Sequence, residues 1–306
     1  MATEGSTKAV VTAMLANLGI AVTKFVAFLL TASSSMLAEA VHSVADTSNQ
    51  ALLLLGGKRA KRAATPEHPF GYGRERYVYG FIVSIVLFTL GGLFALYEAW
   101  HKWADPHPID SWHWVPIVVL LVSIVLEGMA LRTAMIESNR SRGTRSWARF
   151  IRTAKAPELP VILLEDLGAL CGLVFALIGV TLTLVTGDGR WDAAGTAMIG
   201  LLLIVIAVVL AVEMKSLLIG ESAGREHQAA IAKALPGDGV ESVIHLRTLH
   251  LGPEELLVAA KIAISSSATG ADIAAAIDAA EQRVRTAVPI ARVIYLEPDV
   301  FQTEAR

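Results

Sequence analysis

The chain has 306 residues, of which 54% are hydrophobic and only 18% are charged, and its formal net charge is −2. Soluble domains carry about a quarter charged residues, so the composition indicates a membrane protein, while the near-neutral charge and the lack of a basic–aromatic patch give no support for a nucleic-acid partner. Cys171 is the single cysteine, which excludes an intrachain disulfide and a cysteine-based zinc cluster.

Six apolar blocks reach the roughly 20 residues that a helix needs to cross a bilayer. They cover residues 9–31, 34–57, 77–101, 113–136, 160–186 and 193–219. The first block is longer than the apolar core of a cleaved signal peptide, so we expect it to remain as a spanning helix. Polar composition begins after Gly220, and we therefore predict a membrane domain over 1–219 and a second domain over 220–306.

The loops richest in Lys and Arg follow the second and fourth blocks, over residues 58–76 and 140–155. Basic loops remain in the cytoplasm, so this distribution predicts six crossings with both termini cytoplasmic. The expected protein is integral to the membrane, and a bacterial inner membrane is its simplest location.

The tail alternates between helical and strand patterns. Its predicted elements are a helix at 225–235, strands at 241–249 and 255–264, an amphipathic helix at 269–288 and a strand at 291–298. Thr269 and Asp272 form a helix start signal. One face of the second strand is apolar, with Leu256, Val258, Ala260, Ile262 and Ile264. These patterns predict a small cytosolic α+β layer.

The second apolar block carries ionisable side chains at positions where contact with lipid would be costly. His42 and Asp46 lie one helical turn apart, with Glu39 near the same stripe, so the stripe must face protein or water. An imidazole and a carboxylate at this spacing form a two-ligand clamp suited to a divalent cation. Asn49 and Gln50 are interpreted as interhelical hydrogen-bonding groups.

The fifth block supplies a second acidic helix. Glu165 and Asp166 interrupt its apolar run, and Gly168 and Gly172 form a pair of small residues that lets another backbone approach. We expect this approach to bring Asp166 beside the histidine and aspartate of the second block. Adjacent helical residues point about 100° apart, so both acids cannot aim at one ion, and geometry alone does not rank them.

Two further charges lie inside apolar blocks. Lys24, in the first block, could pair with an acid or extend its ammonium to the membrane interface. Glu127, in the fourth block, is expected to pair with Arg132 or with another polar neighbour.

Several of these stretches together resemble the cation diffusion facilitators, the zinc-exporter type of divalent metal/proton antiporter. They are MLAEAVHSVADTSNQALLLLG (36–56), HPFGYGRERY (68–77), LLEDLGALCGLVFALIG (163–179), LGPEELLVAAKIAI (251–264) and VIYLEPD (293–299). The resemblance covers nearly the whole chain. It implies six transmembrane helices per protomer, a homodimer, and a metallochaperone-like (ferredoxin-like) cytosolic tail that dimerises.

The resemblance also implies a tetrahedral transport site, with one pair of ligands spaced i, i+4 on the second helix and another on the fifth. His42 and Asp46 match the first pair, and Asp166 matches the second member of the other pair. Ile162 occupies the remaining position and cannot bind metal. Glu165 is the obvious substitute, and this Glu–Asp form resembles a distinct branch of the family.

Some members of the family have further metal sites in the loop and in the tail. His68 matches one position of the loop site, whose other positions hold residues that are not ligands here. Glu297 matches the tail site, to which His250 could contribute. These three residues are the candidates for secondary metal sites.

The expected function is efflux of a divalent metal cation by alternating access. Metal ligands must be deprotonated, so metal and protons compete, and His42 is the candidate ligand whose side-chain type has an unperturbed pKa in the useful range. The histidine favours Zn²⁺, and transport of another metal such as Mn²⁺ is the alternative, as is a membrane sensor or scaffold that binds metal without moving it. An enzyme is not expected because no HExxH-type signature occurs, and no resident cofactor is expected because the metal is the substrate.

Overall fold

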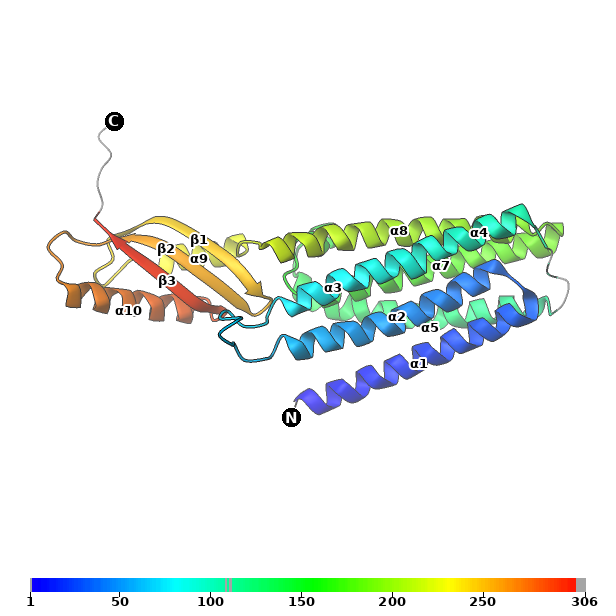
Figure 1. Cartoon of the computed structure of the whole chain (residues 1–306), viewed down its shortest axis with the longest axis horizontal. Coiled ribbons are helices and arrows are strands. Elements are labelled where there is room, and N and C mark those ends of the chain that lie inside the picture. The colour runs from blue at the N-terminus through cyan, green and yellow to red at the C-terminus, as the bar shows by residue number, and fades with distance from the viewer. Residues whose placement is uncertain (1, 108, 110–111, 301–306) are drawn as a thin grey trace, which may run out of the picture. The chain divides into compact units, whose positions relative to one another are not determined.

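The computed structural model describes residues 2–107, 109 and 112–300, with side chains from residue 17 onward. The chain divides into two compact units (Figure 1), one of Met1–Gly57 with Val78–Met214 and one of Lys58–Tyr77 with Lys215–Arg306. Composition predicts a boundary near residue 220. It does not predict that the loop over 58–77, between the second and third long helices, groups with the tail.

The first unit is helical, and each predicted apolar block is a helix. The elements are α1 (Ala2–Thr31), α2 (Ser34–Arg59), α3 (Glu75–Val86), η1 (Leu87–Leu93), α4 (Phe94–Ala104), α5 (Trp114–Arg142), α6 (Trp147–Thr153), α7 (Glu158–Thr186) and α8 (Arg190–Ile219). The third block is one continuous helix in which η1 is a π-helical segment between α3 and α4. Short π-helical segments of this kind, with hydrogen bonds between residues five apart, occur within otherwise regular α-helices.

Four helices of the described chain are long and apolar enough to cross a membrane. They are Glu75–Ala104, Trp114–Arg142, Glu158–Thr186 and Arg190–Ile219. The apolar stretch described in α1, Asn17–Thr31, is shorter, and α2 carries polar side chains through its first half. The protein is therefore an integral membrane protein, and six crossings remain a prediction.

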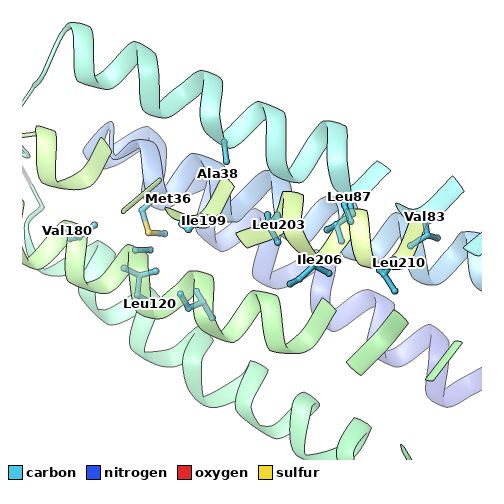
Figure 2. Packing of buried hydrophobic residues seen from close by; sticks show 14 of the residues in the cluster. Met36, Ala38, Val83, Leu87, Leu120, Val180, Ile199, Leu203, Ile206 and Leu210 are labelled. Carbon is cyan, nitrogen blue, oxygen red and sulfur yellow. The ribbon is translucent and has the colours of Figure 1, made fainter. Parts of the chain in front are cut away.

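The apolar core of this unit lies along one stripe of α8. Ile199, Leu203, Ile206 and Leu210 recur at helical spacing and are buried. Figure 2 shows them facing residues of other helices, among them Val83, Leu87, Leu120 and Val180. The opposite face of α8 exposes Leu201, Val205, Val208 and Val212. An apolar core together with an apolar exposed face is the arrangement expected of a helix in lipid.

A buried carboxylate joins the turn between α1 and α2 to the first turn of α8. The oxygens of Asp192 accept hydrogen bonds from the amide and hydroxyl of Ser34, at 2.8 and 3.2 Å, and from the hydroxyl of Ser33, at 2.9 Å. Ser35 donates to the same carboxylate. The amide of Asp192 donates to the Thr183 hydroxyl of α7 at 2.9 Å. The three serines of this uncharged turn thus all donate hydrogen bonds to the carboxylate of Asp192.

Replacing Asp192 by alanine should lower the free energy of unfolding by about 3 kcal/mol, because several buried donors would lose a charged acceptor. Thermal unfolding of the detergent-solubilised protein measures the effect. Asp105→Ala is the matched control, since Asp105 is exposed and pairs with exposed His107. Equal melting temperatures for the two variants would contradict the expectation.

The second unit contains the predicted helix–strand–strand–helix–strand order. Its elements are α9 (Arg225–Ala234), β1 (Ser242–Gly252), β2 (Glu255–Ala263), α10 (Gly270–Ala287) and β3 (Ala291–Asp299). The sheet order is β1-β2-β3, with β1 antiparallel and β3 parallel to β2. The capping box of Thr269 and Asp272 at the start of α10 is confirmed.

The apolar face that the sequence predicts for β2 is buried. Leu256, Val258, Ala260 and Ile262 pack with residues of α9 and α10 in one core, including Ile231, Ala280 and Val284. Both helices therefore cover the same face of the sheet. This small α+β layer confirms the predicted fold of the tail, while its ferredoxin-like classification and its role in dimerisation remain predictions.

Candidate metal centre

One face of α2 is polar and buried. Glu39, His42, Asp46 and Asn49 recur every three or four residues, and together with Ser43 they lie buried inside the first unit. The prediction that this stripe avoids lipid is therefore confirmed. Val44, on another face of the same helix, is exposed, as expected of a helix that turns a single side toward the bundle interior.

His42 and Asp46 lie one helical turn apart on this face. His42 Nδ1 lies 3.6 Å from Asp46 Oδ1, which is too long for a hydrogen bond. Asp46 Oδ1 and both ring nitrogens of His42 are buried and have no hydrogen-bond partner among the described residues. Buried polar atoms nearly always have a hydrogen-bond partner, so unpartnered atoms on two adjacent turns make these side chains candidate ligand-binding groups.

Glu165 is the acid of α7 that faces α2. Its side chain is buried, and its Oε1 accepts a hydrogen bond from Asn49 Nδ2 at 2.6 Å. Asp166 is only partly buried. Both act electrostatically on Asp46, as does Glu127 of α5. The contact with Asn49 thus ranks Glu165 above Asp166 as a group of the α2–α7 interface, which helical geometry alone did not do.

Gly168 and Gly172 of α7 have different nearest neighbours. A β-carbon on Gly172 would lie 2.7 Å from Glu39 Oε1, so this glycine lets α2 approach. A β-carbon on Gly168 would instead meet Ile206 of α8 at 2.7 Å. Both glycines therefore allow a close approach, but only Gly172 of this pair allows the approach of α2, and Gly168 packs α7 against α8.

Sequence reasoning left Lys24 and Glu127 without a settled role. Lys24 is fully buried and pairs with Glu39 at 2.9 Å, so the alternative in which it extends to the interface is wrong. Glu127 is buried, Arg132 is exposed, and no ion pair joins these two described residues. An isolated acid within an apolar block is itself a signal of function, and it could have placed Glu127 here.

Among the described residues, no three His, Cys, Asp or Glu side chains converge closely enough to hold one metal ion. The structure brings His42 to Asp46, and it holds Glu165 on the same interface through Asn49. Binding one cation with all three side chains therefore requires rotamer changes where α2 meets α7. Ligand geometry that tightens only on binding is common in functional sites.

His68 lies in the loop over 58–77. It is exposed, and its ring lies 4.7 Å from that of Tyr72, over which the Arg62 guanidinium lies at 4.6 Å. The loop packs on the β1–β2 hairpin, because a β-carbon on Gly73 would lie 2.8 Å from the Leu251 carbonyl oxygen. His68 therefore lies against the Tyr72 ring, and no group of metal-binding side chains surrounds it among the described residues.

His250 and Glu297 lie apart in the sheet. His250 is opposite Leu256, whereas Glu297 is opposite Lys261, and the five residue steps between these positions of β2 span about 16 Å. Glu297 binds the Lys261 ammonium at 3.2 Å, and hydrogen bonds to Asp299 and Glu297 raise the pKa of Lys261. The two candidates do not form one tail site in this arrangement.

Comparison with known proteins agrees with this organisation. Residues 10–219 match the cation efflux transmembrane domain. The chain is 33% identical over 225 residues to the mouse protein named proton-coupled zinc antiporter SLC30A9, mitochondrial, and 32% identical over 224 residues to its human counterpart; each match covers 72% of this chain and 39% of the relative. It is 29% identical over 261 residues to metal tolerance protein C4 of Arabidopsis thaliana, covering 84% of this chain and 57% of that protein. The chain thus spans about two-fifths of the vertebrate relatives.

Proposed function

Because the chain belongs to the cation efflux family, we propose that it carries a divalent metal cation, foremost Zn²⁺, across its membrane in exchange for protons. The family consists of transporters, so an intramembrane metalloenzyme is set aside. The vertebrate relatives are named as proton-coupled zinc antiporters, and the plant relative as a metal tolerance protein. These names support metal as the cargo.

The observation that carries the proposal is the pair formed by His42 and Asp46. Two side chains one turn apart offer an imidazole nitrogen and a carboxylate oxygen, neither of which is hydrogen-bonded to a described residue. Glu165 lies across the α2–α7 interface as a third ligand, with Asp166 and Glu127 adding negative charge nearby. A cation entering between the helices would thus find both ligands and compensating charge.

Proton exchange follows from the chemistry of the ligands. An imidazole or a carboxylate binds metal only after losing its proton, so each bound cation must displace protons from the same groups. A higher proton concentration on one side of the membrane then favours metal release on that side. No separate proton pathway is needed for the coupling.

The metal is proposed from the donor set. One nitrogen and two or three carboxylate oxygens suit Zn²⁺, and the histidine disfavours ions that take oxygen alone. Mn²⁺ accepts a more oxygen-rich site, so it remains the alternative if Asp166 also binds. A sensor that binds metal without transport is the other alternative, because the tail unit could report binding.

We further propose that transport proceeds by alternating access and that the protein is a homodimer. Its proposed location is a bacterial inner membrane, with both termini in the cytoplasm. The basic loops support the orientation. In this mechanism the helices rearrange about the α2–α7 interface, so that the pair formed by His42 and Asp46 opens to one side of the membrane at a time. The vertebrate relatives are named mitochondrial, which makes localisation of the tagged protein a direct test.

A flux assay in proteoliposomes tests the function. The purified protein is reconstituted with a metal-sensitive dye and a pH-sensitive dye inside, and Zn²⁺, Mn²⁺, Co²⁺ and Ni²⁺ are added outside. We expect saturable Zn²⁺ uptake accompanied by proton movement in the opposite direction. Saturable binding without flux would support the sensor, and Mn²⁺ flux that exceeds Zn²⁺ flux would support the alternative metal.

A further inference from the structure

We infer that Glu39 also contacts the transported cation, and that the ammonium of Lys24, which pairs with Glu39, gives way to the metal ion when it binds. This inference rests on the proposed function. Glu39 lies on the buried face of α2, three residues before His42, which is an axial rise of about 4.5 Å. Asn49 and Glu165 lie beyond Asp46 in the opposite direction along α2. Glu39 would therefore be the next oxygen ligand that an ion leaving the pair encounters.

The two oxygens of Glu39 are used unequally. Oε2 accepts a hydrogen bond from Lys24 Nζ at 2.9 Å, whereas Oε1 is buried and has no hydrogen-bond partner in the part of the chain that the structure describes. Oε1 faces the bare backbone of Gly172, where a β-carbon would lie only 2.7 Å away. It therefore lies at the α2–α7 interface, which also holds Glu165. A fully buried carboxylate oxygen without a donor is a position that a cation can occupy.

Lys24 can give up its contact with the Glu39 carboxylate without losing all of its hydrogen-bond acceptors. Its ammonium also donates to the Ser43 hydroxyl at 2.9 Å, so it keeps one acceptor if a metal ion takes Glu39. It acts electrostatically on His42, Asp46 and Glu127 as well as on Glu39. The ammonium thus compensates negative charge in the pathway and opposes a cation at the His42–Asp46 pair. A tethered charge with these contacts would favour metal release.

The simpler interpretation is that the ion pair only ties α1 to α2. The two interpretations differ in what happens when both charges are removed together. A purely structural pair can be replaced by a neutral pair of similar shape with little loss, because no buried charge is left uncompensated. A carboxylate that contacts the cargo cannot be replaced by an amide without slowing transport.

The experiment compares Lys24→Met, Glu39→Gln and the double variant in the proteoliposome Zn²⁺ assay, with thermal unfolding measured in parallel. Lys24→Met should lower KM for Zn²⁺ about tenfold and lower the maximal rate, because a repelling charge is lost and release slows. The double variant should regain the melting temperature of the wild type while its maximal rate remains at least about tenfold lower. Lys24→Arg, which keeps the charge, should retain most activity.

Lys102→Met is the matched control, because it removes another buried ammonium, which donates to the Ala32 carbonyl at 3.1 Å. It should leave the KM for Zn²⁺ unchanged. A double variant with wild-type KM and maximal rate overturns this inference and leaves the proposed function intact. If the wild type itself moves no metal, the proposed function fails and this inference fails with it.

Discussion

Replacing His42 by alanine should lower the Zn²⁺ flux by more than about 100-fold, and Asp46→Ala should do the same. Changes to groups that only orient a metal ligand typically cost 10–100-fold in affinity or activity, so loss of a ligand should cost more. Both side chains are buried, and within the described residues neither the His42 ring nor Asp46 Oδ1 has a hydrogen-bond partner. Truncation should therefore remove metal binding rather than break a structural bond. Initial rates of Zn²⁺ uptake in proteoliposomes measure the effect.

His101→Ala is the control for the histidine, since His101 is an exposed residue of α4. It should transport at the rate of the wild type. Thermal unfolding should show similar melting temperatures for all three variants. Undiminished flux in both His42→Ala and Asp46→Ala would show that the metal takes another path.

The two acids of α7 should differ in effect. Glu165→Gln keeps an acceptor for Asn49 but removes the charge, and we expect Zn²⁺ flux to fall by more than about 100-fold. Asp166→Asn should reduce flux by about tenfold, because this partly buried side chain acts on Asp46 from outside the ligand set. The same uptake assay and a Zn²⁺ binding titration measure both variants.

Glu137→Gln is the matched control for these acids, because Glu137 is exposed and pairs with Arg140 on the surface of α5. It should leave flux unchanged. The opposite order, with Asp166→Asn the more damaging, would favour the ligand that the family resemblance implies. In that case Glu165 would be a positioning residue held by Asn49.

The sequence alone predicts what depends on short-range periodicity. A run of apolar residues predicts a spanning helix, and alternation predicts the buried face of β2 from Leu256 to Ile262. The capping box at Thr269 is read from two residues three apart. The pairing of His42 with Asp46 is of the same kind, because one helical turn places them together whatever surrounds them.

The rest depends on how the helices rotate against one another. Glu165 and Asp166 are neighbours in the chain, yet only the packing of α7 shows which of them reaches Asn49, 116 residues away. Likewise, Gly168 and Gly172 have the same spacing signature, but one meets α8 and the other meets Glu39. Both differences come from the rotation of α7 about its own axis relative to α2 and α8, which no local sequence pattern encodes.

The long-range polar contacts were also decided by the tertiary structure. The sequence left Lys24 with two alternatives, and burial against Glu39 chose between them, since an ammonium that is fully enclosed must be paired. It assigned no role to Asp192, which gathers the donors of a serine turn 157–159 residues away. Sequence thus determined the elements and the pairing of His42 with Asp46 on α2, the two proposed ligands. The fold determined their partners, because side chains far apart in the chain meet only once the helices have packed.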